Sequence, residues 1–330
     1  MKLLFVKIKY RLSLIKLKLF LSFGLEKFLL KNRYGERILI FHGIDTVGEI
    51  KYNSRFVSEA YFEKIIHYIS NHYNVISIED YYAKKFKKHT LNIAITFDDG
   101  YLNNLKYAIP ILEKYQVPAS FYITTIHQKN DFLWADFLDL VSFHSSKKEV
   151  VFETNLYKKN IKGEFIFNNK SLKSRCIESD FKNITPLFEI FKEDWNAIKK
   201  QSLDDYWRLM NAEQIKKIND NPLFTIGAHG NTHANLSKIS LNEAKSELFQ
   251  NKQILETICK TPIFEFAFPF GFYTKKTIDY CKEIGFTKVL LVSYQNEKDK
   301  NNHSLKNRFG INPYISLKEQ LVFLLRGSYF

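Results

Sequence analysis

Short apolar runs alternate with segments of helical periodicity along most of the chain. Candidate strands cover 37–42, 75–78, 93–97, 119–124, 224–228, 264–268, 287–292 and 308–311, and candidate helices cover 58–72, 107–115, 212–218, 241–257, 275–284 and 317–325. The run Ile93, Ala94 and Ile95 does not alternate with polar residues, which is typical of a parallel strand covered on both faces. Strands that alternate with crossover helices favour a parallel α/β fold. We therefore expect a distorted (β/α) barrel of about seven strands, related to the TIM type.

The alternation breaks between about residue 127 and residue 206. This stretch is longer than a crossover needs. It holds two candidate strands, 150–153 and 164–167, around an Asn-Ile-Lys-Gly turn, and a helical stretch follows up to Lys200. We interpret it as an α+β segment inserted into a barrel domain that covers 35–330. Because long insertions in compact domains are often functional, we expect a lid or a substrate platform.

Residues 1–34 form a basic, apolar arm ahead of the first candidate strand. Lysine and arginine interleave with leucine, isoleucine and phenylalanine along it. The longest uncharged run, Leu19 to Leu25, is far shorter than the roughly 20 residues of a membrane-spanning helix. Glu26 follows that run without the cleavage site of a signal peptide. The alternation from Val6 to Leu14 and the denser apolar pattern after it do not agree on one secondary structure, so the arm either lies on a membrane surface or packs on the domain.

The formal net charge of +14 and the isoelectric point near 9.3 raise the question of an anionic partner. Because the lysines are scattered and no helix-turn-helix, zinc-finger or RNP motif is present, we expect no nucleic-acid partner. The three cysteines are odd in number and lack CxxC spacing, which favours a reducing compartment. We therefore expect a cytoplasmic protein, at the inner membrane surface if the arm binds there, while an extracytoplasmic location stays open.

Ionisable and turn-forming residues follow four of the candidate strands. They are His42, then Asp98 and Asp99, then His229 and His233, and finally Pro269, Phe270 and Gly271. In a barrel of this kind the active site lies at the C-terminal ends of the strands. We therefore expect these residues to meet at one end of the barrel.

Two adjacent carboxylates, Asp98 and Asp99, follow the candidate strand 93–97. Like charges at close range raise each other's pKa unless a cation or a proton separates them. Gly100 permits a sharp turn after them. A metal site is one interpretation of this pattern, and an ordinary Asp-Gly hairpin turn is the other.

His229 and His233 lie four residues apart, with Gly230 and Asn231 between them. In a helix the two rings would share one face, but glycine and asparagine form helices poorly, so a tight turn is the alternative. Alone, the two histidines favour an unremarkable pair over a pair of metal ligands. With Asp99 they form a set of two imidazoles and one carboxylate, which leaves coordination positions open for water and substrate.

Three motifs in this order, TFDDG at 96–100, HGNTH at 229–233 and FAFPFG at 266–271, resemble those of the metal-dependent polysaccharide deacetylases of the NodB type, carbohydrate esterase family four. The resemblance covers roughly 37–326 and is weakest in the insertion. It implies a distorted (β/α) barrel and the hydrolysis of an N-acetyl group with release of acetate. It also implies a divalent cation, with zinc as the first candidate and cobalt, nickel or manganese as alternatives.

The resemblance assigns a role to each of the motif residues. Asp98 would be the catalytic base, and Asp99, His229 and His233 would be the metal ligands. The backbone N–H of Phe270 would stabilise the oxyanion, with Pro269 and Gly271 beside the substrate.

Two features depart from the usual pattern of that family. The third motif usually opens with an arginine, and Glu265, Phe266 and Ala267 provide none. Arg308, in NRFGI, resembles an arginine of related members with long insertions; a surface arginine is the alternative. The late Leu-x-His motif is also absent, but LIFH at 39–42 has its form and resembles the rotated motif order of the poly-N-acetylglucosamine deacetylases. By that analogy His42 is the general acid, and a histidine buried at the barrel rim is the alternative.

Trp134 and Asp136 resemble a Trp-Asp motif that opens the insertion in related members. We expect both to bind substrate, with Trp134 stacking on a sugar ring, although a core tryptophan is the alternative. The expected substrate is an N-acetylated sugar in a polysaccharide or a lipid-linked glycan. An inactive carbohydrate-binding relative, and a hydrolase of another non-peptide C–N bond, are the competing interpretations because fold does not fix substrate.

Overall fold

The computed structural model describes residues 2–23 and 34–329. Its central feature is a parallel sheet in which eight strands follow one another in the order β14-β13-β12-β11-β6-β5-β1-β15, and β4 pairs with β5 outside this path. The strands are β1 (Gly35–Phe41), β4 (Asn74–Val75), β5 (Leu91–Phe97), β6 (Ala119–Ile123), β11 (Phe224–Ala228), β12 (Glu265–Ala267), β13 (Lys288–Leu291), β14 (Leu305–Asn307) and β15 (Phe309–Gly310). The expected distorted barrel is confirmed, with eight strands along its path.

The barrel has a seam between β14 and β15, the two strands at the ends of the strand order, and the chain itself crosses it. β14 and β15 lie at opposite ends of the strand order, although only Arg308 separates them in the sequence. The Arg308 N–H donates to the Leu291 carbonyl of β13 (3.0 Å), while Phe309 on β15 pairs with Leu39 of β1. The strand expected at 308–311 corresponds to β15, and β14 before it was not expected; the backbone leaves one sheet edge and joins the other at Arg308.

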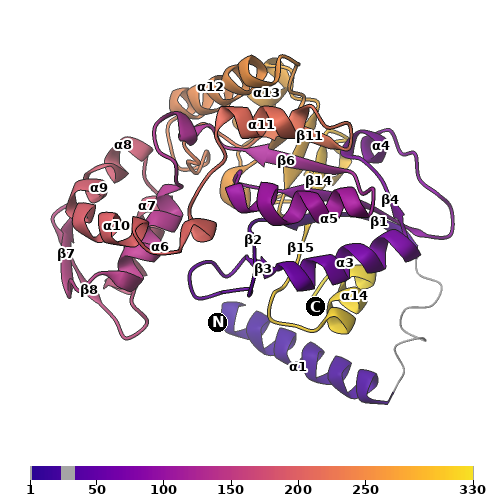
Figure 1. The fold of residues 1–330 in the computed structure, drawn as a ribbon, viewed down its shortest axis with the longest axis horizontal. Coiled ribbons are helices and arrows are strands. Elements are labelled where there is room, and N and C mark those ends of the chain that lie inside the picture. Colours follow the sequence, from indigo (N-terminus) through magenta and orange to yellow (C-terminus); the bar gives the residue numbers. More distant parts are fainter. Residues whose placement is uncertain (1, 24–33, 330) are drawn as a thin grey trace.

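Helices cover the outside of the barrel (Figure 1). They are α3 (Glu59–His72), α4 (Ile78–Tyr82), α5 (Ile109–Lys114), α11 (Ala212–Asn219), α12 (Leu241–Cys259), α13 (Lys275–Glu283) and α14 (Leu317–Arg326), and a π-helical turn (Asn104–Ala108) precedes α5. The strand expected at 75–78 was wrong beyond Val75, because Ser77 caps α4 by accepting a hydrogen bond from the Asp80 N–H.

The barrel strands bury both of their faces. Ile38, Ala94 and Tyr122 belong to a cluster in the interior of the barrel, whereas Ile95 and Phe121 belong to the larger core beneath the helices. Each strand therefore contributes to two apolar layers, which explains why its sequence does not alternate between apolar and polar residues.

The insertion has a hydrophobic core of its own and stands beside the barrel in Figure 1. It contains α6 (Trp134–His144), β7 (Glu149–Phe152), β8 (Asn155–Lys159), β9 (Phe165–Phe167), β10 (Lys170–Ser171), α7 (Leu172–Ile177), α8 (Phe181–Ile184), α9 (Pro186–Ile190) and α10 (Lys192–Lys199). Its four strands form an antiparallel sheet in the order β10-β9-β8-β7. The two expected strands correspond to β7 and β9, and the sequence analysis missed β8 between them.

The N-terminal arm begins with the helix α1 (Lys2–Ser22), which packs against α14. Leu17 of α1 is buried in the main core. The part of the arm at 24–33 lies outside the described residues. Within residues 2–23 and 34–329, no helix combines the length and the hydropathy needed to cross a membrane.

Glu265, at the start of β12, is a buried acid whose ionisation opposes folding. Burial raises the pKa of Glu265 above its usual value, although the Tyr122 hydroxyl, which donates to Oε2 (2.7 Å), and nearby Lys288 partly offset this effect. The folded state therefore holds a proton that the unfolded state releases above about pH 4. The contribution of this bound proton to the free energy of unfolding is fully present below that pH, and it is lost as the pH rises through the folded-state pKa of Glu265.

We predict that Glu265→Gln makes the free energy of unfolding less dependent on pH. The variant should match the parent near pH 4 and exceed it in stability near pH 8, because its side chain cannot ionise. Urea unfolding across this pH range measures the difference. Glu297→Gln, at an exposed position, serves as the control. A Glu265→Gln variant that loses stability equally at both pH values would contradict the prediction.

Candidate active site

The turn after β5 delivers Asp98 and Asp99 to the end of the barrel. The Asp98 N–H donates to the Phe41 carbonyl (3.0 Å), which extends the pairing of β5 with β1 by one step. Asp99 and Gly100 then adopt left-handed backbone conformations, with φ of 78° and 87°. Aspartate tolerates this conformation better than most residues and glycine adopts it freely, so the local sequence suits the turn. The two neighbouring carboxylates consequently point to different partners.

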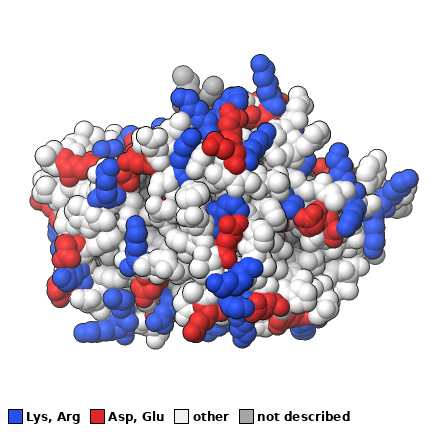
Figure 2. Space-filling model, turned by 90° about the horizontal axis from the view of Figure 1, so that it is seen from above, with Lys and Arg blue, Asp and Glu red and all other residues white. Residues whose placement is uncertain are grey.

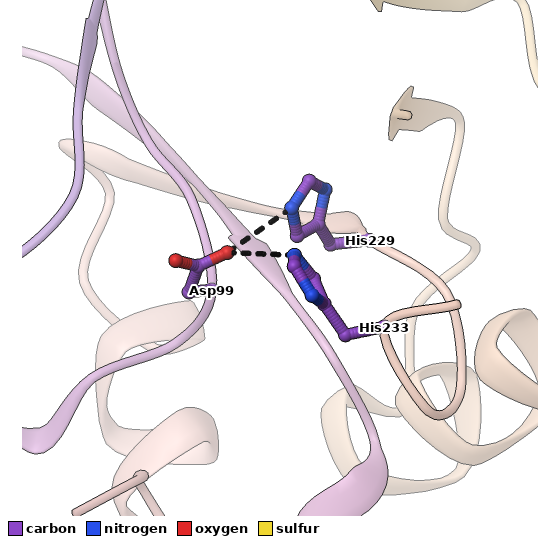
Figure 3. Close-up of side chains that lie close together, drawn as sticks. All are labelled: Asp99, His229 and His233. Carbon is purple, nitrogen blue, oxygen red and sulfur yellow. Dashed lines mark ion pairs between the residues drawn. The ribbon is translucent and has the colours of Figure 1, made fainter. Parts of the chain in front are cut away.

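Asp99, His229 and His233 meet at one point (Figure 3). Their candidate ligand atoms lie within 4.8 Å of one another, and all three residues are buried. The Nε2 atoms of His229 and His233 each lie 3.2 Å from Oδ1 of Asp99. The structure thus brings together the two histidines and the carboxylate that the sequence predicted as metal ligands.

The contact between His229 and Asp99 brings together two atoms that both accept hydrogen bonds. Nδ1 of His229 lies 2.8 Å from the Ala267 carbonyl, which can only accept, so the ring proton belongs on Nδ1. In the neutral ring, Nε2 then directs a lone pair at Asp99 Oδ1. Within the described residues, neither carboxylate oxygen of Asp99 has a well-aligned hydrogen-bond partner, and Nδ1 of His233 has none either. Buried acceptors arranged in this way fit a divalent cation, and the set of two nitrogens and one oxygen suits zinc.

The loop that carries both histidines is a turn and not a helix. Gly230 and His233 have positive φ values of 81° and 57°, and a Cβ atom on Gly230 would lie 3.3 Å from Cγ of Pro269. The side chain of Asn251, on α12, accepts from the N–H groups of His229 (2.8 Å) and Gly230 (2.9 Å). The barrel and α12 therefore hold both imidazoles in place before any ligand binds.

Asp98 is paired with the arginine at the barrel seam. Arg308 donates from its two terminal nitrogens to Oδ1 (2.6 Å) and Oδ2 (2.7 Å) of Asp98, and both side chains are buried. Burial alone would raise the pKa of Asp98, but the Arg308 guanidinium more than offsets this effect and the pKa lies below its usual value. Asp98 is therefore an ionised base at neutral pH. The alternative that Arg308 is a surface residue is excluded.

His42 follows β1 and lies beside this group. Burial lowers the pKa of His42 to about 3, with Arg55 adding to the effect and Asp99 and Asp98 opposing it. The ring is therefore neutral in the free protein. The general-acid role expected for His42 stays a prediction, and in that role His42 must take up a proton before it can give one.

The turn after β12 places Phe270 above the metal-site histidines. Phe270 has a left-handed backbone conformation (φ 56°), and its ring centre lies 4.6 Å from that of His233. The turn is closed by a hydrogen bond from the Gly271 N–H to the Phe268 carbonyl (3.0 Å). The Phe270 N–H stays the predicted donor to the oxyanion. Pro269 and Gly271 shape this turn.

Trp134 is a core residue that supports the site. It is 1% exposed, and its indole N–H donates to the His233 carbonyl (3.3 Å). Its ring also contacts that of Phe270, with 5.9 Å between centres. These contacts favour the core alternative over stacking on a sugar. Trp134 therefore helps to fix both His233 and the turn that carries Phe270.

Asp136 is likewise buried and acts through its neighbours. It accepts from the hydroxyl of Tyr101 (2.6 Å) and from the side-chain amide of Asn53 (3.1 Å). Burial raises the pKa of Asp136 to about 7, while Arg55 and Lys173 oppose this shift. We expected Asp136 to contact substrate. Because both of its oxygens are occupied, it is better suited to fixing Asn53.

Arg55 is a site residue that the sequence analysis did not single out. Its NH1 lies 3.5 Å from Oδ2 of Asp99, and its Nε donates to Oδ1 of Asn53 (3.2 Å). Burial would raise the pKa of Asp99, but Arg55 and then His233 bring it well below its usual value. Arg55 thus keeps Asp99 ionised and engages the oxygen that faces away from the histidines. Its position in a polar loop after the first strand was the one available signal in the sequence.

The fold resembles those of solved deacetylases. The Streptococcus pyogenes deacetylase PplD, solved in complex with acetate, aligns with a TM-score of 0.55 and 16% identity over 87% of this chain and 96% of that one. BC0361, a polysaccharide deacetylase from Bacillus cereus, gives 0.53 and 19% over 88% and 68%. IcaB from Ammonifex degensii gives 0.51 and 15% over 88% and 97%. At these identities the likeness concerns the fold.

The family assignment comes from the sequence itself. A search of curated proteins finds no match. The family model described as polysaccharide deacetylase matches residues 85–289, which is more than half of the chain and includes the ligand positions Asp99, His229 and His233. The chain therefore belongs to the polysaccharide deacetylase family and is a hydrolase of the N-acetyl carbon–nitrogen bond.

Proposed function

We propose that this protein removes acetyl groups from N-acetylated sugars of a polysaccharide or lipid-linked glycan, with the help of a divalent cation at Asp99, His229 and His233. One observation carries the proposal. Three buried groups with unshared electron pairs converge beside a second carboxylate, Asp98, which an arginine keeps ionised. Zinc suits the donor set, and cobalt, nickel or manganese remain alternatives to be tested.

When bound, the cation would polarise the acetamide carbonyl and lower the pKa of a nearby water. Asp98 accepts the proton of that water as the water attacks. The Phe270 N–H donates to the oxygen of the tetrahedral intermediate. His42, once protonated, gives a proton to the departing sugar amine, and acetate is released. Arg308 keeps Asp98 oriented throughout, so that the base faces the attacking water.

The two carboxylates should separate into a catalytic and a ligand role. We predict that Asp98→Asn lowers the rate of acetate release by roughly 10²-fold or more and leaves zinc binding within a few fold of the parent. Asp99→Asn should lose zinc binding as well as activity. Acetate release from N-acetylated oligosaccharides, with and without a chelator, is compared with calorimetric titration of zinc.

The outcome distinguishes the competing functions. Turnover by Asp98→Asn at the parental rate would remove Asp98 as the base. Parental protein that binds zinc and oligosaccharide but releases no acetate would indicate an inactive sugar-binding relative. Release of a product other than acetate from a different amide would indicate another C–N hydrolase.

Arg308 should couple to Asp98 in stability and in activity. We predict that Arg308→Gln lowers the free energy of unfolding by roughly 3–5 kcal/mol, because it leaves a buried carboxylate without its partner. The double variant Asp98→Asn with Arg308→Gln should recover part of this loss. Arg308→Lys retains the charge but loses the bidentate contact, so its stability and activity should lie between those of the parent and of Arg308→Gln. Denaturant unfolding and acetate release measure both effects, and additive losses in the double variant would refute the coupling.

Arg55 should control how well the metal site resists acid. We predict that Arg55→Gln raises the pH at which zinc is lost by about one pH unit, because the pKa of Asp99 rises when the guanidinium is removed and protons then compete with the cation. Zinc retention is measured against pH. Arg208→Gln, which removes a guanidinium paired with exposed Asp204, is the matched control. An unchanged midpoint in Arg55→Gln would show that Asp99 does not depend on Arg55.

A further inference from the structure

The helix α1 buries one apolar face against the domain. Leu17 is 4% exposed and belongs to the main core, and Leu14 and Leu21 are half-buried against the same core. Ser13 accepts a hydrogen bond from Arg326 at the end of α14 (3.2 Å). In Figure 1, α1 runs along the outside of α14. This face of α1 is therefore fully explained by packing.

A second apolar face of α1 points away from the domain. Leu12, Ile15 and Leu19 are each about half exposed, and Phe23, directly after the helix, is 77% exposed. Their spacing of three and four residues places them in one stripe. At about 100° per residue, this stripe lies roughly opposite the buried face. We call Leu12, Ile15, Leu19 and Phe23 the outer stripe. No part of the described chain covers it.

Cations flank the outer stripe on both sides. Arg11 and Lys18 lie along one edge of the stripe by helical spacing, and Lys16 lies along the other. All three are exposed, and none forms an ion pair with another described residue. α1 contains no acidic residue. On the face of the barrel shown in Figure 2, by contrast, acidic and basic side chains are interspersed.

We propose that the outer stripe of α1 docks on a membrane surface that contains anionic phospholipids, with the helix axis in the plane of the headgroups. The apolar side chains enter the boundary between headgroups and acyl chains, and Arg11, Lys16 and Lys18 contact lipid phosphates. This inference stands independently of the proposed catalytic mechanism. A protein docked in this way would be within reach of a lipid-linked glycan.

A second copy of the chain fits the outer stripe less well. In a symmetric dimer the same surface meets itself, so the cations along both edges would face cations. α1 offers no carboxylate to compensate them, and like charges in juxtaposition disfavour such a pairing. A layer of lipid phosphates supplies the missing opposite charge and an apolar phase together. The charge pattern therefore selects the membrane as the occupant.

The first experiment is flotation of the full-length protein with lipid vesicles. We expect the protein to float with vesicles that contain phosphatidylglycerol and to stay behind with vesicles of phosphatidylcholine alone. Ile15→Ser, Leu19→Ser and Phe23→Ser together should lower the partition coefficient by roughly tenfold or more. Lys16→Glu with Lys18→Glu should lower it by a similar factor, and high salt should weaken the parent's binding.

The matched control removes three exposed apolar side chains elsewhere. Val47→Ser, Val151→Ser and Ile161→Ser change residues that are more than half exposed and lie outside α1. This variant should float as the parent does. Acetate release from a soluble oligosaccharide should be unchanged in every α1 variant, which separates failure of this proposal from failure of the proposed function. Circular dichroism confirms that each variant is folded.

The second experiment places a probe on the outer stripe. The three native cysteines are buried and unpaired, so a thiol-reactive fluorophore will label Leu19→Cys selectively. Its emission should shift to shorter wavelength with anionic vesicles, whereas the same label on Ile161→Cys should not shift. Equal flotation of the parent and the outer-stripe variant would overturn the proposal. So would a blue shift that depends on protein concentration without vesicles, because that result identifies a second copy as the occupant.

Discussion

The contact between acceptor atoms at Asp99 is the constraint on which the site depends. A carboxylate oxygen and a histidine lone pair at 3.2 Å repel each other unless a positive charge lies between them. The protein nevertheless fixes this arrangement from several directions. Asn251 and the Ala267 carbonyl hold His229, Trp134 holds the backbone of His233, and Asp99 sits in a left-handed turn. This unfavourable geometry is maintained by the surrounding fold, as is common at functional sites.

The same end of the barrel gives two neighbouring carboxylates different roles. Asp98 faces a guanidinium that satisfies both of its oxygens, while Oδ1 of Asp99 faces the two histidines. Arg308 lies where the chain passes from β14 to β15, and its side chain reaches Asp98 from there. The guanidinium of Arg308, between β14 and β15, thus takes the place of the arginine that the third motif lacks. Glu265, at the start of that motif, is instead a buried acid bonded to Tyr122.

The barrel and the convergence of Asp99, His229 and His233 could be predicted from the sequence because both depend on local patterns. Runs such as 93–97 are apolar throughout, and the motif residues follow strand ends that a parallel barrel must bring together. β8 was not predicted from the sequence because Asn155–Lys159 is largely polar and lies at the surface of the insertion. The helix α1 was not predicted because apolar residues on two opposite faces give no single amphipathic pattern. The roles of Arg55 and Trp134 depend on long-range packing, which no local pattern records.

The contacts of the insertion favour a fixed platform over a moving lid. Trp134, on its first helix, donates to the carbonyl of His233, and Asp136 on the same helix holds Asn53, which in turn orients Arg55 beside Asp99. The core of the insertion also includes Tyr101, two residues after Asp99. Opening this segment as a lid would therefore pull on two of the three candidate metal ligands, His233 and Asp99. A segment joined to the site in this way is better suited to shape the substrate surface than to open and close over it, because the positions of His233 and Asp99 depend on it remaining in place.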